Sequence, residues 1–322
     1  MNTLTVIQAE DFLTKQEYAP KWLIDRIIPK NETCLLFGAV STYKTFVASG
    51  IGTLIANLNE SLGKVEGSKE NPPKVLYLPT EQKNTMQDRL KALKGKYGDR
   101  QFDLATEHVD MLDPISVRTI AQTLKHHNYD LLIIDTVSKS MGSGDTANED
   151  LARRYLTACE LFNEMGCAVL LVHHTGHNET KRAKGSTLWH DNVSSVLTIK
   201  KLKQSKYHRS LHIVKAKSEL EGKSFPFIMR EELVPNFTLW ADFSSTQDDP
   251  IVEAILSHLI DDPVDKNTIR KSIYPTFEAE YSNAESFRKK FDRKVKDMLG
   301  QELISSVQEG KATLLYRTKE EI

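Results

Sequence analysis

The stretch Gly38–Thr45 carries the residue types and spacing most able to do chemistry. Its sequence, GAVSTYKT, fits the pattern G-x-x-x-x-G-K-[ST] except that Tyr43 replaces the second glycine. In this pattern backbone N–H groups of a tight loop surround a phosphate, the lysine reaches the β and γ oxygens, and the hydroxyl binds Mg²⁺. The sequence therefore predicts an ATP and Mg²⁺ site with these residues: Gly38, Ala39, Val40, Ser41, Thr42, Tyr43, Lys44 and Thr45.

The match alone is weak, because a capping Thr45 and a solvated Lys44 at an ordinary helix start would give the same letters. Its context favours a phosphate loop, since a buried strand pattern precedes the stretch and a helical pattern follows it. Tyr43 is a departure with a consequence. Glycine permits close backbone approach, so a side chain at this position must point away from the phosphates.

Polar side chains end three other predicted strands. Asp135 ends the run LLIID and is the expected second anchor for Mg²⁺. Glu81 follows KVLYLPT, where a carboxylate can polarise the attacking water or simply favour a helix start. His173 and His174 end CAVLLVHHT, where one of them could sense phosphate loss or the pair could cap the sheet.

The elements that must position these side chains alternate between short apolar runs and helical patterns. This alternation predicts an α/β fold with a parallel sheet covered on both faces. The predicted strands are Thr33–Gly38, Lys74–Thr80, His108–Leu112, Tyr129–Thr136 and Cys167–Thr175, and the predicted helices are Lys44–Leu58, one ending near Tyr97, Pro114–His127 and Asn148–Met165. An antiparallel extension of the sheet is predicted from Ser194–Lys203, Tyr207–Lys217, Phe225–Leu233 and Phe237–Asp242.

The last part of the chain has a different pattern. Three helices are predicted at Ile251–Ile260, Lys266–Ile273 and Asn283–Leu299, followed by a hairpin of Leu303–Val307 and Thr313–Tyr316. Three helices and then a hairpin is the order of a winged helix-turn-helix. We therefore expect an N-terminal segment at residues 1–21, an ATPase domain at 22–243 and a winged helix-turn-helix domain at 244–322.

Composition bounds the function. Hydrophobic residues make up 39% and charged residues 27% of 322 residues, which supports a sizeable core and excludes a disordered chain. The net charge of −1 predicts no global attraction to polyanions. The three cysteines, at positions 34, 159 and 167, have no metal-ligand spacing and are expected to be reduced core thiols. Without a secretion signal or a membrane-spanning run, a cytoplasmic protein with no membrane partner is expected.

Nucleic-acid binding must therefore come from local clusters of charge. Residues 181–217 contain ten Lys or Arg against one acid, Asp191. This patch is either a solvated loop or a sequence-independent DNA site, for which Lys181, Arg182 and Lys184 are the candidates. The third predicted helix of the tail carries a second cluster opposite its aromatic stripe. Its candidates for duplex contact are Arg288, Lys289 and Arg293, although winged helices also bind proteins.

The ordered series of phosphate loop, Glu81, the Asp135 strand and the HHTG…KGS region resembles the RecA-type hexameric ATPases over about residues 22–242. It is most similar to RepA-like plasmid and phage replicative helicases and their KaiC-like relatives. The resemblance implies a hexameric ring with ATP between subunits and a single DNA strand in the central channel. It also implies fingers from the neighbouring subunit at Lys215 and Lys217, where Lys217 replaces the usual arginine and weakens the expected stabilisation.

Two hypotheses follow. The first is an ATP-dependent, DNA-translocating helicase of a plasmid, phage or other mobile element. In it Lys44 and Thr45 hold phosphates and Mg²⁺, Glu81 activates water, and His174 couples the site to the basic channel. The second is a DNA-binding replication initiator or regulator that uses ATP as an assembly switch without unwinding.

Overall fold

The structure is a computed structural model that describes residues 7–10, 21–81, 83–176, 182–201, 207–218, 220–233, 237–243, 250–259, 263–278, 281, 283–300, 304–310 and 312–317. The chain divides into two compact units. Residues up to 201 and 209–243 form the first unit, and residues 202–208 with 244–322 form the second.

The first unit is built on a nine-stranded sheet in the order β11-β10-β9-β8-β3-β7-β6-β4-β5. Its parallel strands run from β5 to β8, with β3 between β7 and β8. They span Thr33–Gly38 (β3), Val75–Pro79 (β4), Asp103–Leu104 (β5), Leu131–Asp135 (β6), Ala168–His174 (β7) and Ser195–Lys201 (β8). The four central strands from β4 to β3 are almost wholly buried, as continuous apolar runs require when both faces are covered.

The first strand predicted for the antiparallel extension, Ser194–Lys203, is wrong in direction, because β8 pairs parallel with β3 and belongs to the parallel part of the sheet. The connection that contains Leu188–Asp191 returns the chain to the amino edge of the sheet before β8 begins, as a parallel pairing requires. The antiparallel extension itself is present from the next strand on. It comprises β9 (His208–Lys215), β10 (Ser224–Leu233) and β11 (Phe237–Asp242). β9 pairs antiparallel with β8, and β11 pairs antiparallel with β10. A separate two-stranded sheet joins β1 (Trp22–Ile24) and β2 (Ile28–Pro29). The parallel sheet and its extension confirm the predicted α/β core, which fits a RecA-like P-loop fold.

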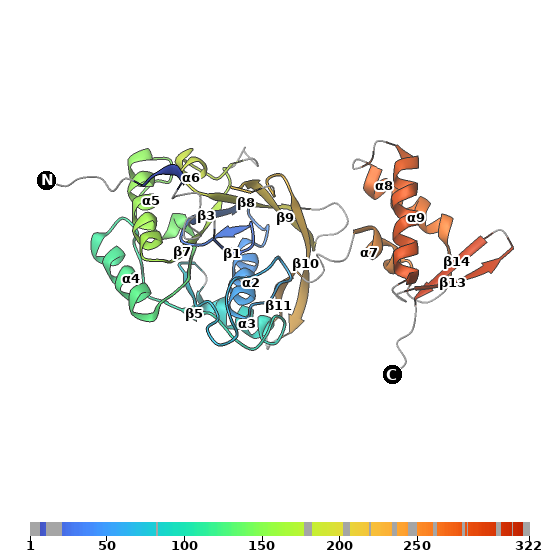
Figure 1. The fold of residues 1–322 in the computed structure, drawn as a ribbon, viewed down its shortest axis with the longest axis horizontal. Coiled ribbons are helices and arrows are strands. Elements are labelled where there is room, and N and C mark those ends of the chain that lie inside the picture. Colours follow the sequence, from blue (N-terminus) through green and yellow to red (C-terminus); the bar gives the residue numbers. More distant parts are fainter. Residues whose placement is uncertain are drawn as a thin grey trace. The chain divides into compact units, whose positions relative to one another are not determined.

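Helices cover both faces of the sheet (Figure 1). One face packs on α4 (Pro114–His127), α5 (Glu149–Glu164) and the short α6 (Leu188–Asp191), with Phe37, Ile134 and Trp189 in one apolar core. The other face packs on α2 (Lys44–Ala56), with α3 (Lys83–Leu93) beside it. β11 contacts both α2 and α3, so α2 lies between the central sheet and the extension and is buried along most of its length.

The second unit contains α7 (Pro250–Ser257), β12 (Val264–Asp265), α8 (Lys266–Phe277), α9 (Ala284–Gly300) and a hairpin of β13 (Ile304–Glu309) and β14 (Ala312–Arg317). β12 pairs with β14, which gives a three-stranded sheet. Buried side chains from all three helices form its core, including Ile255, Ile273, Phe287 and Phe291. α8 continues four residues beyond its predicted end, through Pro275, because Phe277 is buried in the same core.

One predicted strand is wrong. His108–Leu112 contains no strand, and the edge strand is instead β5, at Asp103–Leu104. The backbone donors of the mispredicted segment bond elsewhere: Met111 N donates to Ser140 O, and Leu112 N to the Asp110 carboxylate. Turn-forming aspartate chemistry therefore replaces a sheet ladder here.

The three cysteines are free and buried, as predicted, and burial raises the pKa of each thiol. Among the described residues, no helix has the length and apolar character needed to cross a membrane.

Candidate functional site

Four neighbouring strands end at one edge of the sheet, and each delivers a predicted site residue there. Gly38 ends β3, Asp135 ends β6, His174 ends β7, and Glu81 lies two residues after β4. The carboxyl ends of parallel strands are the usual place for a ligand in an α/β sheet. The topology thus brings together side chains that are far apart in the sequence.

Glu81, Asp135 and His174 line a cavity of about 320 Å³ at this edge, whereas Gly38 does not. Its lining includes the predicted residues Val40, Ser41, Tyr43, Lys44, Thr45, Glu81, Asp135 and His174. Phe46, Arg89 and Thr136 also line it, and the sequence did not identify them.

The loop between β3 and α2 takes its shape from local contacts. Ser41 and Tyr43 have positive φ values of 62° and 70°, and the Thr42 hydroxyl donates to Ala39 O at 2.8 Å. A Cβ at Gly38 would lie 2.7 Å from the Thr42 hydroxyl oxygen, so a larger residue there would displace the Thr42 side chain from its bond to Ala39 O. Tyr43 is the N-cap of α2 and provides no side-chain cap. Tyr43 therefore does not cap the first backbone N–H groups of the 13-residue helix α2. N–H groups at the start of a helix are well placed to bind an anion.

The Lys44 ammonium is folded into the loop. Its Nζ donates to the carbonyl oxygens of Gly38 and Ala39, both at 2.9 Å, and the residue is only 6% exposed. Burial lowers the pKa of Lys44 to about 8, while the nearby Asp135 and Glu81 carboxylates oppose that shift. A buried cation whose hydrogen bonds within the described residues go to two carbonyls is well placed to exchange them for phosphate oxygens.

Asp135 fits the chemistry of a magnesium site. Its carboxylate is 3% exposed, Oδ2 accepts a 2.6 Å hydrogen bond from the Tyr77 hydroxyl, and Oδ1 is buried with no hydrogen-bond partner among the described residues. Burial raises the pKa of Asp135, and the Tyr77 and Thr45 hydroxyls and the Arg89 guanidinium oppose the rise. An unsatisfied carboxylate oxygen beside the Thr45 hydroxyl matches the oxygen ligands that Mg²⁺ uses.

Glu81 is held by the loop after β6. Thr136 Oγ1 donates to Glu81 Oε1 at 3.1 Å, and Thr136 N donates to the Thr80 hydroxyl at 2.7 Å. This pair of bonds ties the end of β4 to the end of β6, so the carboxylate has a fixed direction at the cavity.

Arg89 is the main site residue that the sequence analysis missed. It comes from the middle of α3, is 6% exposed, and its guanidinium carbon lies 4.7 Å from the centroid of the Phe46 ring. Burial lowers the pKa of Arg89, and Tyr77 and Asp135 oppose the shift. Met86, Arg89 and Leu93 are buried and spaced by three and four residues, so helical periodicity was the available signal.

The two histidines have different surroundings. His174 is half-buried at the cavity, and burial, followed by the charge of Lys44, lowers its pKa. His173 is fully buried, packs edge-on against Trp189 and accepts a bond from His174 N through Nδ1. Burial lowers the pKa of His173 to about 3, so its ring is neutral at pH 7.

Two of the predicted single-strand residues, Arg182 and Lys184, are exposed, while Lys181 lies outside the described residues. Lys184 N donates to His174 O at 2.7 Å, and Ala183 forms a bridge with Thr175. The backbone of Lys184 is therefore bonded to the strand end that lines the cavity.

Lys215 and Lys217 do not join this cavity. β9 runs antiparallel to β8, so Lys215 pairs with Val196 near the amino edge of the parallel strands. There Lys215 Nζ donates to the carbonyls of His190 and Asp191, and Lys217 Nζ lies 3.0 Å from a Glu32 carboxylate oxygen.

In the second unit, Arg288, Lys289 and Arg293 are exposed on α9. Phe287, Phe291 and Val295 form the buried stripe of the same helix. Arg288 lies 3.4 Å from a Glu285 carboxylate oxygen, with both side chains about half exposed.

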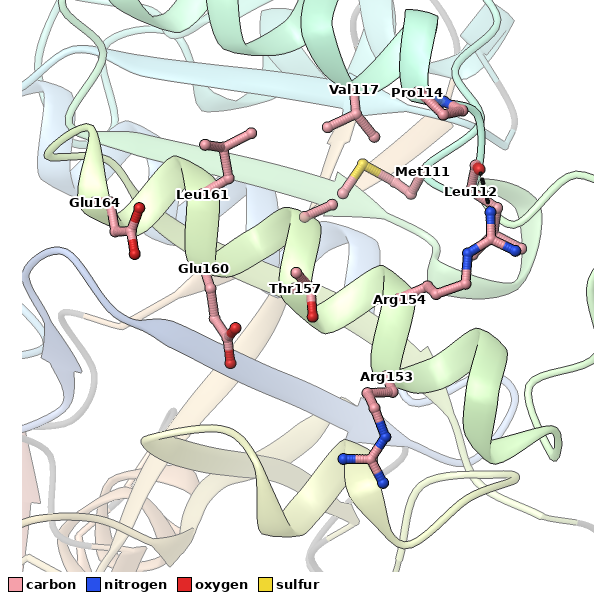
Figure 2. Close-up of a pocket in the computed structure, with 11 residues that line it drawn as sticks. Met111, Leu112, Pro114, Val117, Arg153, Arg154, Thr157, Glu160, Leu161 and Glu164 are labelled. Atoms are coloured by element: carbon pink, nitrogen blue, oxygen red, sulfur yellow. Dashed lines mark hydrogen bonds between the residues drawn. The ribbon is translucent and has the colours of Figure 1, made fainter. Parts of the chain in front are cut away.

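A second, larger cavity of about 570 Å³ lies along α4 and α5 (Figure 2). Met111, Leu112 and Val117 line it from the α4 side, and α5 contributes Leu161 and Arg154. Arg154 donates to Leu112 O at 3.0 Å. None of the predicted site residues that the structure describes lines this groove.

The sheet order, the loop after β3 and the charged groups at its edge define a P-loop ATPase core of the RecA-like class. The chain belongs to the AAA domain family AAA_25, whose model matches residues 3–180.

Solved structures similar to this chain include the RadB recombinase, at 16% identity and a TM-score of 0.44, covering 62% of this chain and 88% of that one. A KaiC-like protein from the archaeon Pyrococcus horikoshii OT3 is similar at 18% identity and a TM-score of 0.46, covering 68% of this chain and 93% of that one. No curated protein matches the sequence.

Proposed function

We propose that the chain is an ATP-hydrolysing, DNA-translocating enzyme that works as a hexameric ring, a replicative helicase of the RepA-like type. One observation carries the proposal: Lys44, Asp135 and Glu81 converge on a single cavity at the carboxyl edge of the sheet. A cation, a buried acceptor and a directed carboxylate are the groups that phosphoryl transfer to water requires.

The loop binds the phosphates of ATP. The backbone N–H groups at the start of α2 surround them, and Lys44 Nζ exchanges the carbonyls of Gly38 and Ala39 for β and γ oxygens. Thr45 and Asp135 would hold Mg²⁺. When bound, the ion neutralises charge on the β and γ oxygens.

Glu81 orients the attacking water and accepts its proton. The Thr136 hydroxyl fixes Oε1, which leaves the other carboxylate oxygen to face the water. His174, at the end of β7, contacts the same cavity and couples the presence of the γ-phosphate to the segment that follows it.

That segment holds single-stranded DNA in the channel of the ring. Lys181, Arg182 and Lys184 supply phosphate contacts, and the bond from Lys184 N to His174 O supports their link to the nucleotide site. Lys215 and Lys217 act on the ATP of the neighbouring subunit. The place of Lys215 at the opposite edge of the sheet and the pairing of Lys217 with Glu32 support action in trans rather than on their own cavity.

Residues 22–243 are the proposed ATPase domain and residues 244–322 a winged helix-turn-helix. The order of three helices and a hairpin supports the second assignment. Arg288, Lys289 and Arg293 on α9 then contact duplex DNA, because they lie opposite the buried aromatic stripe.

The second candidate is a DNA-binding initiator or regulator in which ATP drives assembly only. The observation that favours it is Lys217, which provides a point charge where the related enzymes use an arginine fork, and which pairs with Glu32 of its own chain.

A strand-displacement assay with ATP on forked DNA separates the two candidates. We expect unwinding by the wild type, and ATP turnover that single strands stimulate. Replacing Arg182 and Lys184 with Ala should remove the stimulation and lower the salt slope of single-strand binding by about 0.7 per lost phosphate contact. The matched control replaces Arg118 and Lys125, two exposed cations of α4. Duplex binding and ATP-dependent assembly without any unwinding would establish the initiator instead.

A further inference from the structure

Tyr43, which replaces glycine in the phosphate loop, has an unusual backbone conformation and packs against specific side chains. Tyr43 has φ 70° and ψ 28°, in the left-handed region that favours glycine. Its ring is half-buried rather than free in solvent. A tyrosine in this conformation costs free energy that glycine would not, so something else must stabilise it.

Two aromatic rings lie between two cations in the site. The Arg209 guanidinium carbon lies 4.8 Å from the Tyr43 ring centroid, and the Tyr43 and Phe46 rings meet edge-on at 6.0 Å. Arg89 lies over the Phe46 ring at 4.7 Å. We call this set of four side chains the cation–aromatic ladder. It joins β9, the phosphate loop and α3.

Arg209 reaches the loop because of strand register. It pairs with Lys201 at the start of β9, which places it at the carboxyl edge of the sheet, where the phosphate loop lies. Arg209 is 4% exposed, so its guanidinium stacks on the Tyr43 ring away from bulk water. Cation–aromatic contacts are strongest when they are desolvated in this way.

We propose that Arg209 is a positioning residue that holds Tyr43, and through it the phosphate loop, in the conformation that a second glycine would otherwise provide. The guanidinium draws the ring out of the space that the phosphates need and keeps the left-handed backbone at Tyr43. Ser41 and Tyr43 then present the loop amides inward. The inference rests on the proposed nucleotide site, but it assigns a role to a residue outside the phosphate-loop pattern.

The test is a double-mutant cycle with Mg-ADP as the probe, measured by titration calorimetry on the full chain. Arg209→Met should weaken ADP binding about tenfold in the natural sequence, comparable with the cost of an unsupported left-handed residue. In combination with Tyr43→Gly the same change should have less than about a twofold effect, because glycine adopts this backbone unaided. Tyr43→Phe should keep the dependence on Arg209, since the ring remains.

Two controls keep the result interpretable. Arg230→Met removes an arginine from the same sheet extension, where it pairs with Asp242, and should not weaken ADP binding. Arg209→Lys keeps a cation near the ring, so it should weaken ADP binding less than Arg209→Met. If the methionine variant does not fold, the lysine variant replaces it in the cycle. The proposal would be overturned if Arg209→Met weakened ADP binding equally in the natural sequence and in the Tyr43→Gly variant.

Hydrogen exchange of the nucleotide-free protein separates this inference from the nucleotide site itself. Amides of residues 39–45 should exchange faster in Arg209→Met than in the wild type, and the difference should vanish when Tyr43→Gly is also present. If the wild type binds no ADP, the nucleotide site is wrong, yet this exchange cycle still decides the role of Arg209. Unchanged exchange in Arg209→Met would refute that role.

Discussion

The cavity at the carboxyl edge of the sheet and the groove along α4 and α5 differ in where their charges lie. In the smaller cavity Lys44, Arg89 and Asp135 are at most 6% exposed, and burial shifts the pKa of each. In the larger groove Arg153 and Glu160 are exposed at the rim of an apolar floor. Volume alone would select the groove, whereas charge burial selects the cavity.

The difference shows that buried charged groups are better evidence for a functional site than exposed ones are. Removing a charged group from water costs several kcal/mol unless partners compensate, so such groups persist chiefly where they serve a purpose. The cavity also contains Asp135 Oδ1, a buried oxygen that has no hydrogen-bond partner in the part of the chain that the structure describes and that a ligand can use. Exposed charges such as those at the groove cost little and indicate little.

The largest expected effect comes from the cation of the cavity. Lys44→Ala should abolish ATP binding or turnover, because Lys44 is the only cation among the residues of the phosphate loop, Gly38–Thr45. Arg154→Ala, a cation of the groove, is the control and should retain full turnover. A steady-state ATPase assay on both variants measures this. Equal turnover by Lys44→Ala and wild type would remove the loop from the mechanism.

The carboxylates of the two regions give the next comparison. Glu81→Gln should keep ATP bound while turnover falls at least about 100-fold, the usual size of a general-base contribution. Glu160→Gln, in the groove, should leave turnover unchanged. Single-turnover kinetics with bound ATP separate binding from hydrolysis here. If Glu81→Gln hydrolyses ATP normally, another group activates the water.

Nucleotide affinity should depend on pH through the pKa of Lys44, which burial lowers to about 8. Phosphate favours the charged ammonium, so binding takes up a proton above that pH and affinity falls as pH rises. ADP should bind about tenfold more weakly at pH 9 than at pH 7. Lys44→Arg keeps its charge throughout and should show no such slope. A flat profile for the wild type would show that Lys44 stays charged in the free protein.

The lowered pKa of Lys44 has the opposite effect on the stability of the nucleotide-free protein. The folded pKa lies below the ordinary value of 10.5, so the unfolded chain binds more protons between pH 8 and 10.5. Stability of the free protein therefore rises with pH across that window, whereas nucleotide affinity falls. Denaturant unfolding at several pH values, with Lys44→Met as the reference, measures the difference.

The smallest effect belongs to the groove. Leu161→Ser should change turnover less than about twofold and the free energy of unfolding by about 0.5 kcal/mol or less, because the side chain is 42% exposed. A large loss of turnover would show that the groove takes part in the reaction, directly or through assembly.

How much of the site was predictable depends on whether its signals are local. Gly38–Thr45 and the strand-end residues Asp135 and Glu81 follow from short patterns, and the parallel topology brings them together. Arg89 and Tyr77 come from the interior of a helix and of a strand, where no motif marks them. Their role depends on packing against Phe46 and Asp135, which only the tertiary structure supplies.

The central strands of the sheet were likewise predictable from local patterns, whereas a segment at the edge of the sheet was not. Buried strands such as β6 are long apolar runs and were predicted within two residues. The segment His108–Leu112 was mispredicted because its side chains alternate as in a strand, while Asp110 and Asp113 bond to nearby backbone N–H groups. Competition between side-chain and ladder hydrogen bonds is decided by neighbours that the sequence does not reveal.

Hydrogen exchange with and without Mg-ADP tests most directly whether the cavity, and not the groove, holds a nucleotide. Phosphates surrounded by backbone N–H groups should slow exchange at residues 39–46 by at least about tenfold, the equivalent of about 1.4 kcal/mol. Residues 111–117 and 153–164, which line the groove, should show no change. Protection of the groove with an unaffected phosphate loop would contradict the central claim.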